Sequence, residues 1–529
     1  MQAFAALLDG LVYTQSRTRK LALLARYFHS TPDPDRGWAL AALTDGVPLR
    51  LPLRKMLAGL TSRFIDPVLY KLSRDYVGDT AETVALLWPE RRTNAAPATL
   101  DAVIADMSIG TIAEKTERLG RLLDTLDPSG RWALLKLIGG APRVGVSARL
   151  ARTAVAEAFG KDVSEIEEIW HALEPPYVDL FQWLDGSAQK PDPGQKPVFR
   201  PVMLAHPIED EDWARMMPED FLAEWKWDGI RVQIAARQGD VRIFSRQGDD
   251  ISASFPEIRS AFLAHDCVVD GELLVMRVGV LAPFNDLQQR LNRKTVTAKM
   301  LKDYPAHVRL YDLLFDGADD IRALPFAARR AQLELWHAKH HPPLTDVSAL
   351  VGFETFEDLG RLWAATRDEG IEGLMLKRRN SAYQAGRIKG EWFKWKRAPL
   401  TLDCVLMYAQ RGSGKRSSFY SDYTFGAWRP GQSGAPELVP VGKAYSGFTD
   451  EELKRLDKWI RDHTAETFGP VRAVEPGLVF EVAFDAVQPS SRHKSGVAMR
   501  FPRIHRIRWD KPASEADTLA TVKGLIGKS

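Results

Sequence analysis

A proline-rich segment between Gly186 and Pro207 most constrains how this chain can fold. Besides Gly194, it contains Pro191, Pro193, Pro197, Pro201 and Pro207. Such a density of prolines cannot continue a helix, and it fits a semi-rigid linker between domains. With 529 residues, the chain is long enough for about three domains. We therefore expect one folded domain before the linker and two after it.

The part before the linker has apolar residues at helical spacing. The first predicted helix has an apolar face made of Phe4, Leu7, Leu8 and Leu11. Near the end of this part, Gly139-Gly140 ends another apolar helix, and the basic turn Arg143–Arg149 follows. Glycines there would let backbone amides approach phosphate groups. The pattern predicts an all-helical domain over residues 1–190, whose basic side chains are either simply solvated or contact phosphates.

The part after the linker alternates between strands and helices. The expected strands include Val232–Ile234, Val241–Phe244 and Cys267–Asp270, and the expected helices include Phe326–Lys339 and Glu357–Asp368. This pattern predicts an α+β domain over residues 208–399.

Beyond Pro399 the chain has short strands and one inserted helix. Strands are expected at Asp403–Tyr408, Phe419–Trp428 and Leu478–Phe484, and helices at Asp450–Thr464 and Ala513–Gly527. Thr449 is expected to cap the first of these helices. Short strands around one helix suit an OB-fold over residues 400–529, a small β-barrel that commonly binds nucleic acids.

Composition excludes several classes of protein. The net charge of +3 is small, so only local basic patches can argue for a nucleic-acid partner. Cys267 and Cys404 lie far apart, which favours a reducing compartment and excludes a disulfide framework or a cysteine-rich zinc site. No apolar run reaches the ~18 residues of a membrane span, and Asp9 interrupts the first apolar segment, so no signal peptide is expected. A cytoplasmic protein is the simplest interpretation.

The segment Glu224–Arg231 carries the strongest chemical signal. Lys226 lies between two tryptophans and is followed by Asp228 and a glycine. A lysine amine becomes a nucleophile when apolar neighbours or nearby cations favour its neutral form. Asp228 could orient this amine or help hold a metal ion. Taken alone, however, an amphipathic strand with an exposed lysine would be the simpler interpretation.

Further blocks follow this segment in order along the chain. They are Ser245–Gly248, Asp270–Glu272, Tyr311–Asp312, Glu372–Lys377, Trp392–Lys396, Arg500–Arg503 and Arg508–Lys511. Together the blocks resemble those of the ATP-dependent DNA ligase family, which is part of the covalent nucleotidyltransferase superfamily. Departures are small, such as Gln247 where asparagine is common.

The resemblance implies a monomeric, nucleoid-associated enzyme that seals nicked double-stranded DNA. Its domains would be an all-α DNA-binding domain at 1–190, a linker at 191–207, an α+β nucleotidyltransferase (adenylation) domain at 208–399 and an OB-fold domain at 400–529. Three displacements at phosphorus are implied. A lysyl-AMP forms from ATP with release of pyrophosphate, AMP passes to the 5′-phosphate of the nick, and the 3′-hydroxyl then displaces AMP. Mg²⁺ or Mn²⁺ would assist.

The resemblance also assigns roles to single residues. Lys226 would be the nucleophile, and the metal-binding carboxylates would be Asp228, Glu272 and Glu372. Contacts to adenine and ribose are expected from Glu224, Tyr311, Arg231 and Glu272, although Tyr311 also fits a core position. Contacts to phosphate or the sugar side are expected from Arg246, Arg387, Lys377, Lys394, Lys396, Arg508 and Lys511. Alternation along a strand would place Lys394 and Lys396 on one side, although a strand with solvated lysines has the same pattern.

Basic residues in the C-terminal part are candidates for DNA contacts. Residues 492–511 contain seven Lys or Arg and a single acidic residue, Asp510. Without the resemblance, a solvated basic face explains such a stretch equally well. With it, DNA contacts are expected from Arg143, Arg149, Arg411, Lys415, Arg416, Arg500 and Arg503.

Two alternative functions deserve comparison with a DNA ligase. A GTP-dependent RNA-capping guanylyltransferase or an RNA ligase belongs to the same superfamily, but the helical N-terminal part and the block Arg500–Arg503 favour DNA. The other alternative is a nick-binding protein without catalytic activity. The presence of Lys226, Glu272 and Glu372 argues against such a loss.

Overall fold

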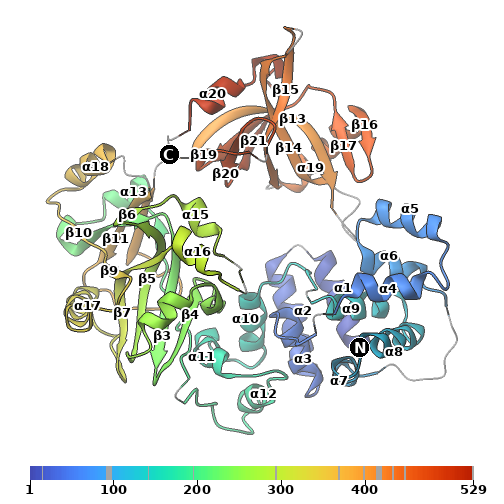
Figure 1. Ribbon diagram of the computed structural model, residues 1–529, viewed down its shortest axis with the longest axis horizontal. Helices are drawn as coiled ribbons and strands as arrows, with labels where there is room; N and C mark the ends of the chain where they lie inside the picture. The colour runs from blue at the N-terminus through green and yellow to red at the C-terminus, as the bar shows by residue number, and fades with distance from the viewer. Residues whose placement is uncertain are drawn as a thin grey trace. The chain divides into compact units, whose positions relative to one another are not determined.

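The computed structural model describes the whole chain except residues 15, 50, 91–97, 141, 195, 292, 294, 367–369, 397–398, 413–419, 432–433, 446–447, 492 and 527–529. The chain forms two compact units, one of residues 149–397 and one of residues 1–148 together with 398–529. Figure 1 shows a helical N-terminal part, a central part with sheets and helices, and a β-rich C-terminal part.

Residues 1–148 form helices that share apolar cores. The helices are α1 (Gln2–Tyr13), α2 (Arg17–Ser30), α3 (Asp35–Leu43), α4 (Leu53–Thr61), α5 (Pro67–Val77), α6 (Thr80–Leu87), α7 (Leu100–Ser108), α8 (Ile112–Asp124) and α9 (Pro128–Ile138). The predicted face of α1 is confirmed, because Phe4, Leu7, Leu8 and Leu11 are all buried. Local sequence sets the helix starts: Asp66 and Asp127 each precede a proline and accept hydrogen bonds from backbone amides of the first turn.

Three further helices belong, apart from Ala148, to the same compact unit as the central sheets. They are α10 (Ala148–Ala158), α11 (Val163–Ile169) and α12 (Val178–Leu184). Glu168 forms an ion pair of 2.9 Å with Arg322, and the ring of His171 lies 4.5 Å from that of Phe244. These contacts explain why the boundary between the compact units lies at residue 148, well before the proline-rich segment.

One central sheet has the strand order β1–β12–β11–β2–β10. Its strands are β1 (His206–Pro207), β2 (Phe221–Trp227), β10 (Leu350–Val351), β11 (Ile371–Arg378) and β12 (Trp392–Lys396). Alternation along β2 sends Ala223 and Trp225 into an apolar core with Trp363 of α18 (Phe356–Ala365), near α13 (Asp210–Trp213). The side chain of Lys226 therefore points to the opposite face of β2.

The other central sheet has the strand order β4–β3–β5–β7–β8, with β6 beside β5 and β9 beside β7. Its strands are β3 (Ile230–Arg237), β4 (Asp240–Ser245), β5 (Cys267–Arg277), β6 (Val280–Leu281), β7 (Ala306–Asp316), β8 (Asp319–Asp320) and β9 (Thr345–Val347). Ile258 of α14 (Pro256–Ala261) and Leu333 of α17 (Phe326–His340) pack on its apolar face. Two short helices, α15 (Phe284–Gln288) and α16 (Ala298–Asp303), complete this part.

The C-terminal part is rich in strands, and an apolar core lies among them. Its main sheet has the order β15–β14–β13–β17–β16, β18 pairs with β13 and β21, and β19 pairs with β20. The strands are β13 (Leu400–Arg411), β14 (Tyr420–Pro430), β15 (Pro436–Tyr445), β16 (Thr464–Phe468), β17 (Val471–Val474), β18 (Val479–Phe484), β19 (Ala486–Pro489), β20 (Val497–Arg500) and β21 (Arg503–Arg508). The predicted cap is confirmed, since Thr449 accepts a hydrogen bond from the amide of Glu452 at the start of α19 (Asp450–Asp462).

The helix predicted at Ala513–Gly527 is wrong in its extent. A short 3-10 turn covers Ala513–Glu515, and α20 is limited to Leu519–Lys523. Between them, the amide of Asp517 donates to the carbonyl of Asp403, and the carboxylate of Asp517 accepts from the amide of Asp403, both at 2.8 Å. This exchange takes the backbone of Asp517 out of any helix.

Within the described residues, no helix has the length and apolar character that crossing a bilayer requires.

Candidate active site

Lys226 lies at the end of β2, where β2 and β12 bring lysines together on either side of β11. In the register of the sheet, Gly373 of β11 is opposite Lys226 on one side and Lys396 of β12 on the other. Met375 is likewise opposite Lys394, so the two lysines of β12 lie on one side of the strand, as predicted. Strands β2 and β12 are two strand spacings apart, about 10 Å, which long lysine side chains can span to reach one bound anion.

A β-bulge turns Glu372 toward these lysines. Trp227 pairs with Ile371 and Lys226 pairs with Gly373, so Glu372 is an extra residue in β11. Its carboxylate accepts a hydrogen bond of 3.0 Å from Lys226, and its other oxygen binds Lys396. Burial opposes ionisation of Glu372, but the two lysines outweigh it and hold its pKa below the usual value. The bulge thus places one carboxylate between two ammonium groups.

Two glycines permit this close packing. A Cβ atom on Gly373 would overlap the carbonyl oxygen of Trp395 in β12. A Cβ atom on Gly229 would overlap the carbonyl oxygen of Leu273 in β5. Gly373 therefore sets the distance between β11 and β12, and Gly229 lets the turn after Lys226 approach the second sheet.

Arg231 and Glu272 lie opposite each other on β3 and β5 of that second sheet. Arg231 is fixed by hydrogen bonds to the carboxylate of Asp270 and the carbonyl of Met203, both at 2.6 Å. Asp270 is fully buried and also accepts a hydrogen bond of 2.5 Å from the hydroxyl of Tyr383. The guanidinium of Arg231 is consequently held in one position at the edge of the site.

Glu272 is a carboxylate in an unusual environment. Burial raises its pKa to about 8, and the opposing attraction of Lys226 does not compensate. The negative charges of Glu372 and Asp228 also contribute to the high pKa. Such a group would take up a cation readily, because a positive charge beside it would remove the electrostatic cost of ionisation.

Further cations surround Lys394. Burial, followed by the positive charges of Arg387 and Lys396, lowers the pKa of Lys394. Burial and the cations Arg231 and Arg387 likewise lower the pKa of Arg246. These mutual effects show that four of the predicted phosphate contacts lie near one another and form a region of concentrated positive charge: Arg246, Arg387, Lys394 and Lys396.

Glu224 and Lys377 form a separate buried group on the same sheet. Lys377 is paired with Glu224 at 2.5 Å, and its ammonium lies 4.5 Å from the centre of the Tyr311 ring. Lys377 is four residues beyond Gly373, about 13 Å along the strand. The structure therefore brings Lys377 together with Glu224 and Tyr311, not with Lys226.

Sequence reasoning missed three residues of this region. Asp270 and Tyr383 fix Arg231, and Arg330 of α17 binds Glu224 at 2.6 Å. The spacing of Arg330 from Phe326 in a predicted helix would have placed it on the buried face, which is a recognisable signal.

The residues of the last motif form ion pairs within the C-terminal part. Both Arg508 and Lys511 contact the carboxylate of Asp403, at 3.4 and 2.8 Å, and Arg508 also binds Asp510. Arg503 and Arg506 face Asp485 and Glu481 in the same way. Acidic residues elsewhere in the fold thus offset much of the positive charge counted in the stretch 492–511.

The other predicted DNA contacts differ in their surroundings. Arg411 is linked to Tyr420, with its guanidinium 5.5 Å from the ring, and Arg500 lies 5.2 Å from the ring of Phe501. Arg149 pairs with Glu167 at 3.4 Å. Lys415 and Arg416 lie outside the described residues.

The turn that contains Arg143 is supported from beneath by a buried lysine. Lys20, which is 6% exposed, donates hydrogen bonds to the carbonyls of Val144 and Gly145 at 3.2 and 2.8 Å. Arg143 itself has a positive φ of 52° and is exposed. The fold thus holds this turn rigidly while its arginine faces solvent.

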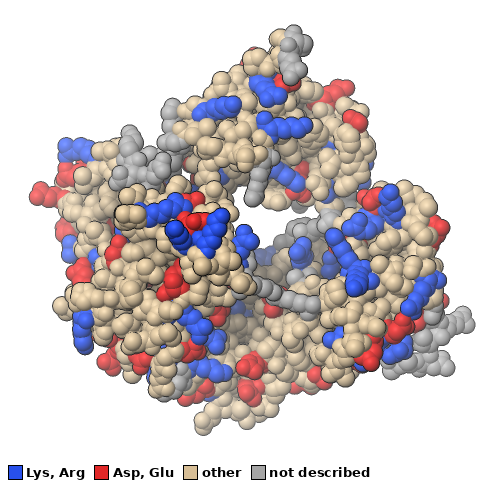
Figure 2. Space-filling model, viewed as in Figure 1, with Lys and Arg blue, Asp and Glu red and all other residues tan. Residues whose placement is uncertain are grey.

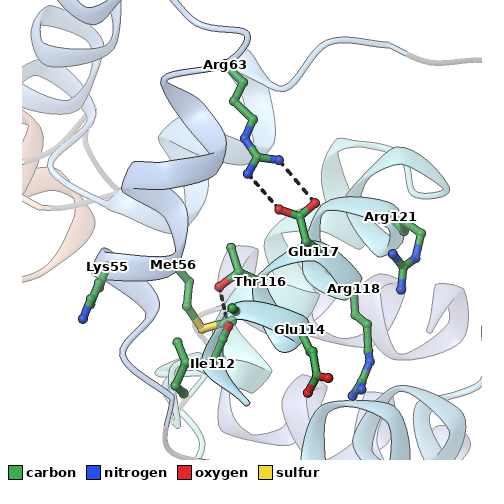
Figure 3. Close-up of a pocket in the computed structure, with 10 residues that line it drawn as sticks. Lys55, Met56, Arg63, Ile112, Glu114, Thr116, Glu117, Arg118 and Arg121 are labelled. Atoms are coloured by element: carbon green, nitrogen blue, oxygen red, sulfur yellow. Dashed lines mark hydrogen bonds and ion pairs between the residues drawn. The ribbon is translucent and has the colours of Figure 1, made fainter. Parts of the chain in front are cut away.

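Among the hollows that the described residues form on the helical part, two share a lining residue, Lys55 of α4. The first, of about 800 Å³, lies between α4 and α8, where Arg63 and Glu117 form an ion pair of 2.7 Å (Figure 3). In this hollow the acidic side chains Glu114 and Glu117 balance part of the positive charge. It is therefore a weak candidate for binding an anion.

The second hollow, of about 600 Å³, is much more basic, and we call it the basic cleft. Its charged lining consists of Arg54, Lys55, Arg74, Lys136, Arg143 and a single acid, Asp79. Asp79 binds Lys136 at 2.5 Å, and in the described part of the chain no acid pairs with the other four. Figure 2 shows Lys and Arg side chains gathered over the helices α4 to α6.

The carboxylates of the central unit fit a Mg²⁺ ion. Among the described residues, no cluster of three or more His, Cys, Asp or Glu is arranged to enclose a metal. Mg²⁺ usually needs only one or two carboxylates, because water and substrate phosphates complete its octahedron. Glu272, with its raised pKa, and Glu372 supply such a sparse set.

Comparison with known proteins identifies the family. Residues 202–396 match the ATP dependent DNA ligase domain, and residues 416–511 match the ATP dependent DNA ligase C terminal region. A probable DNA ligase of Koribacter versatilis is 33% identical, over 98% of this chain and 95% of its own. A DNA ligase of Thermococcus onnurineus is 28% identical, over 97% and 95%. The solved structure Pmar-Lig_PreS3 covers 96% of this chain and 99% of its own, with a TM-score of 0.58 at 17% identity, which indicates a similar fold. The chain therefore belongs to the ATP-dependent DNA ligase family and is a DNA ligase that uses ATP.

Proposed function

We propose that Lys226 is the nucleophile of this ligase and carries AMP between ATP and DNA. In the first step its neutral amine attacks the α-phosphorus of ATP, a nitrogen–phosphorus bond forms as the nitrogen loses a proton, and the bond to the bridging oxygen breaks so that pyrophosphate leaves with that oxygen. The observation that supports this role best is the shared carboxylate of Glu372 between Lys226 and Lys396. A bound phosphate can replace this carboxylate as the partner of both lysines.

The second and third steps would use the same phosphate site. The 5′-phosphate of the nick attacks the AMP on Lys226, so the nitrogen–phosphorus bond breaks and a pyrophosphate bond forms. The 3′-hydroxyl then attacks the 5′-phosphorus, and AMP leaves. Lys394, Lys396, Arg246 and Arg387 would stabilise the negative charge that develops on the phosphate oxygens, since positioning and positive charge dominate catalysis of phosphoryl-type transfer.

The nucleotide would lie between the two central sheets. Tyr311 would stack on the base and Glu224 would contact its edge, with Lys377 fixing the carboxylate of Glu224. Arg231 and Glu272 would hold the ribose. The fixed position of Arg231, with hydrogen bonds to Asp270 and Met203, supports this role because a rigid donor loses little entropy on binding.

Mg²⁺ or Mn²⁺ would be held by Glu272 and Glu372, with Asp228 close by. A divalent ion there supplies positive charge to the phosphate oxygens. Glu372 would have to release at least one of its lysines when it binds the ion, and those lysines would then be free to contact phosphate.

Nicked double-stranded DNA would bind through the basic cleft and the C-terminal part. Arg143 and the other cations of the cleft that have no acidic partner among the described residues fit the backbone phosphates of a duplex, which account for most of the affinity of such proteins. Arg149, Arg411, Lys415, Arg416, Arg500 and Arg503 would add contacts. Arg508 and Lys511 would orient the β- and γ-phosphates of ATP in the first step, after leaving Asp403.

We further propose a domain organisation and a state for the enzyme. A DNA-binding domain (1–190), a linker (191–207), an adenylation domain (208–399) and an OB-fold barrel (400–529) would act together as a monomer. Chromosomal DNA as the substrate would imply a cytoplasmic enzyme at the nucleoid. The pairing of β18 with both β13 and β21 supports a barrel, because it extends the main sheet through β18 to β21.

The test is a labelling experiment. Purified protein, first treated with pyrophosphate to remove bound AMP, is mixed with Mg²⁺ and with ATP or GTP labelled at the α-phosphate. We expect label on the wild type from ATP alone, none on Lys226→Ala, and transfer of the label to nicked DNA. Label from GTP would favour the capping alternative. Label on Lys226→Ala would show that another residue is the nucleophile.

A further inference from the structure

We propose that Arg330 is a positioning residue for Lys226, because it fixes the strand on both sides of that lysine. Arg330 does not contact Lys226, and nothing in the motifs of the family singles it out. The proposal rests on the proposed role of Lys226 as the nucleophile.

Arg330 lies on α17, which packs against β7 and β9 (Figure 1). It is only 4% exposed, and its guanidinium makes three contacts. One terminal nitrogen donates to Oε1 of Glu224 at 2.6 Å, and the other donates to the carbonyl of Ser348 at 2.5 Å. The Nε atom binds the exposed carboxylate of Glu334 at 2.8 Å. A planar guanidinium that binds in two directions fixes both partners relative to each other.

The first contact fixes β2 before Lys226. Glu224 is two residues earlier in the strand and 2% exposed, and its second oxygen binds Lys377. Both carboxylate oxygens therefore have cationic partners. Because charge-assisted hydrogen bonds are strong in a buried environment, Glu224 is a firm anchor for the strand.

The second contact fixes the residue after Lys226. The hydroxyl of Ser348 accepts a hydrogen bond of 3.1 Å from the indole nitrogen of Trp227. The guanidinium of Arg309 lies 4.1 Å from the centre of the same indole ring. Arg309 is held in turn by a hydrogen bond of 2.8 Å from its Nε atom to the carboxylate of Asp346. Through Ser348, Arg330 thus helps to position Trp227.

Lys226 consequently lies between two points that are both held in part by Arg330. Its own side chain is 22% exposed and binds Glu372, so its amine has freedom to move if the strand shifts. A displacement of about 1 Å in a reacting group can cost ~100-fold in rate. Loss of Arg330 should therefore slow reactions at Lys226 without removing any group that contacts the substrate phosphates.

The three chemical steps allow a sharp test, because Lys226 reacts in the first two and not in the third. Arg330→Met keeps the apolar volume and leaves Glu224 paired with Lys377. We expect this variant to be slower by about 10- to 100-fold in labelling from ATP and in transfer of AMP to nicked DNA. Sealing of a nick whose 5′-phosphate already carries AMP, measured without ATP, should change by less than about 3-fold.

Matched variants separate positioning from a loss of fold. Glu334→Gln removes the exposed partner of Arg330 and should behave as wild type in all three steps. Arg330→Lys keeps a buried positive charge but cannot bind Glu224 and Ser348 at once as the planar guanidinium does. This variant should therefore be faster than Arg330→Met in the first two steps but slower than the wild type. Should Arg330→Met fail to fold, Ser348→Ala removes only the acceptor for Trp227 and should slow the same two steps by several-fold.

Two results would overturn the proposal. One is a folded Arg330→Met variant with wild-type rates in the first two steps. The other is equal slowing of all three steps, which would mean that Arg330 supports the nucleotide pocket or the whole unit and not Lys226 in particular. An absence of label on the wild type would instead refute the proposed role of Lys226, so the two failures are distinguishable.

Discussion

The ammonium groups of Lys226 and Lys396 are held by the same carboxylate, one on each oxygen of Glu372. The two lysines come from strands that flank β11, and the bulge in β11 supplies the carboxylate between them. Two cations that share one anion are prepared for phosphate, because an incoming phosphate oxygen can take over the role of the carboxylate. The proposed phosphate site would thus be assembled before ATP binds.

Glu372→Gln should reduce labelling from ATP by about 100-fold or more. An amide cannot neutralise two ammonium groups, so Lys226 and Lys396 would repel each other and move apart, and a ligand for Mg²⁺ would be lost. The rate of single-turnover labelling measures the effect. Glu354→Gln changes the charge equally at an exposed position and should label as wild type. Equal rates for the two variants would show that the bridge has no catalytic importance.

Gly373→Ala should damage both stability and activity. The added Cβ overlaps the carbonyl of Trp395, and the backbone of β12 must move away, taking Lys396 with it. Forced overpacking of this kind costs about 1–3 kcal/mol. We expect a lower melting temperature and at least ~10-fold slower labelling. Gly352→Ala, where a Cβ meets no atom within 4 Å, is the control and should leave both unchanged.

His171 should make the central unit less stable in mild acid. Burial, followed by the positive charge of Arg152, lowers the pKa of His171 from 6.5 to about 4. The unfolded chain therefore binds a proton near pH 6.5 that the folded chain does not bind until about pH 4. Stability is fully present above pH 6.5 and falls as the pH decreases through this window, by at most about 3 kcal/mol.

His171→Gln isolates this contribution, because other titrating groups cancel in the comparison. The difference in free energy of unfolding between wild type and variant should shift with pH between 4 and 6.5, in favour of the variant at the lower pH. Denaturant unfolding at several pH values measures it. A difference that is constant across this range would show that His171 takes up its proton equally in both states.

Much of the fold could be predicted from local patterns. The buried face of α1, the cap at Thr449 and the common side of Lys394 and Lys396 all follow from helical or strand periodicity, which depends on neighbours in sequence. The helix expected at Ala513–Gly527 failed because Asp517 is drawn to Asp403, more than a hundred residues away. Periodicity contains no information about such a partner.

The sequence motifs named the residue types of the candidate site but did not indicate their pairings. The motifs identify Glu372 and Lys377 as members of one block. In the structure, however, a bulge turns Glu372 toward Lys226, and Lys377 lies farther along β11, where it pairs with Glu224. The partner of Glu224 on α17, Arg330, is 106 residues away in the chain. Register shifts and buried ion pairs of this kind are settled by tertiary packing, so they require the structure.

The basic cleft should control how DNA affinity depends on salt. Each phosphate contact that is lost should reduce the slope of log affinity against log salt by about 0.9. The double variant Arg54→Gln with Lys55→Gln removes two cations that have no acidic partner within the described residues, so we expect the slope for nicked duplex DNA to fall by about 2. Labelling from ATP without DNA should not change, since neither residue belongs to the central unit.

The control for this prediction is the double variant Arg63→Gln with Glu117→Gln. It removes an ion pair from the neighbouring hollow and leaves the net charge of the chain unchanged. We expect its salt slope to match that of the wild type. If the Arg54 and Lys55 variant keeps the wild-type slope, the cleft does not contact phosphates. If the slope of log affinity against log salt falls by the same amount in both double variants, the helical part binds DNA through a broader surface than the cleft.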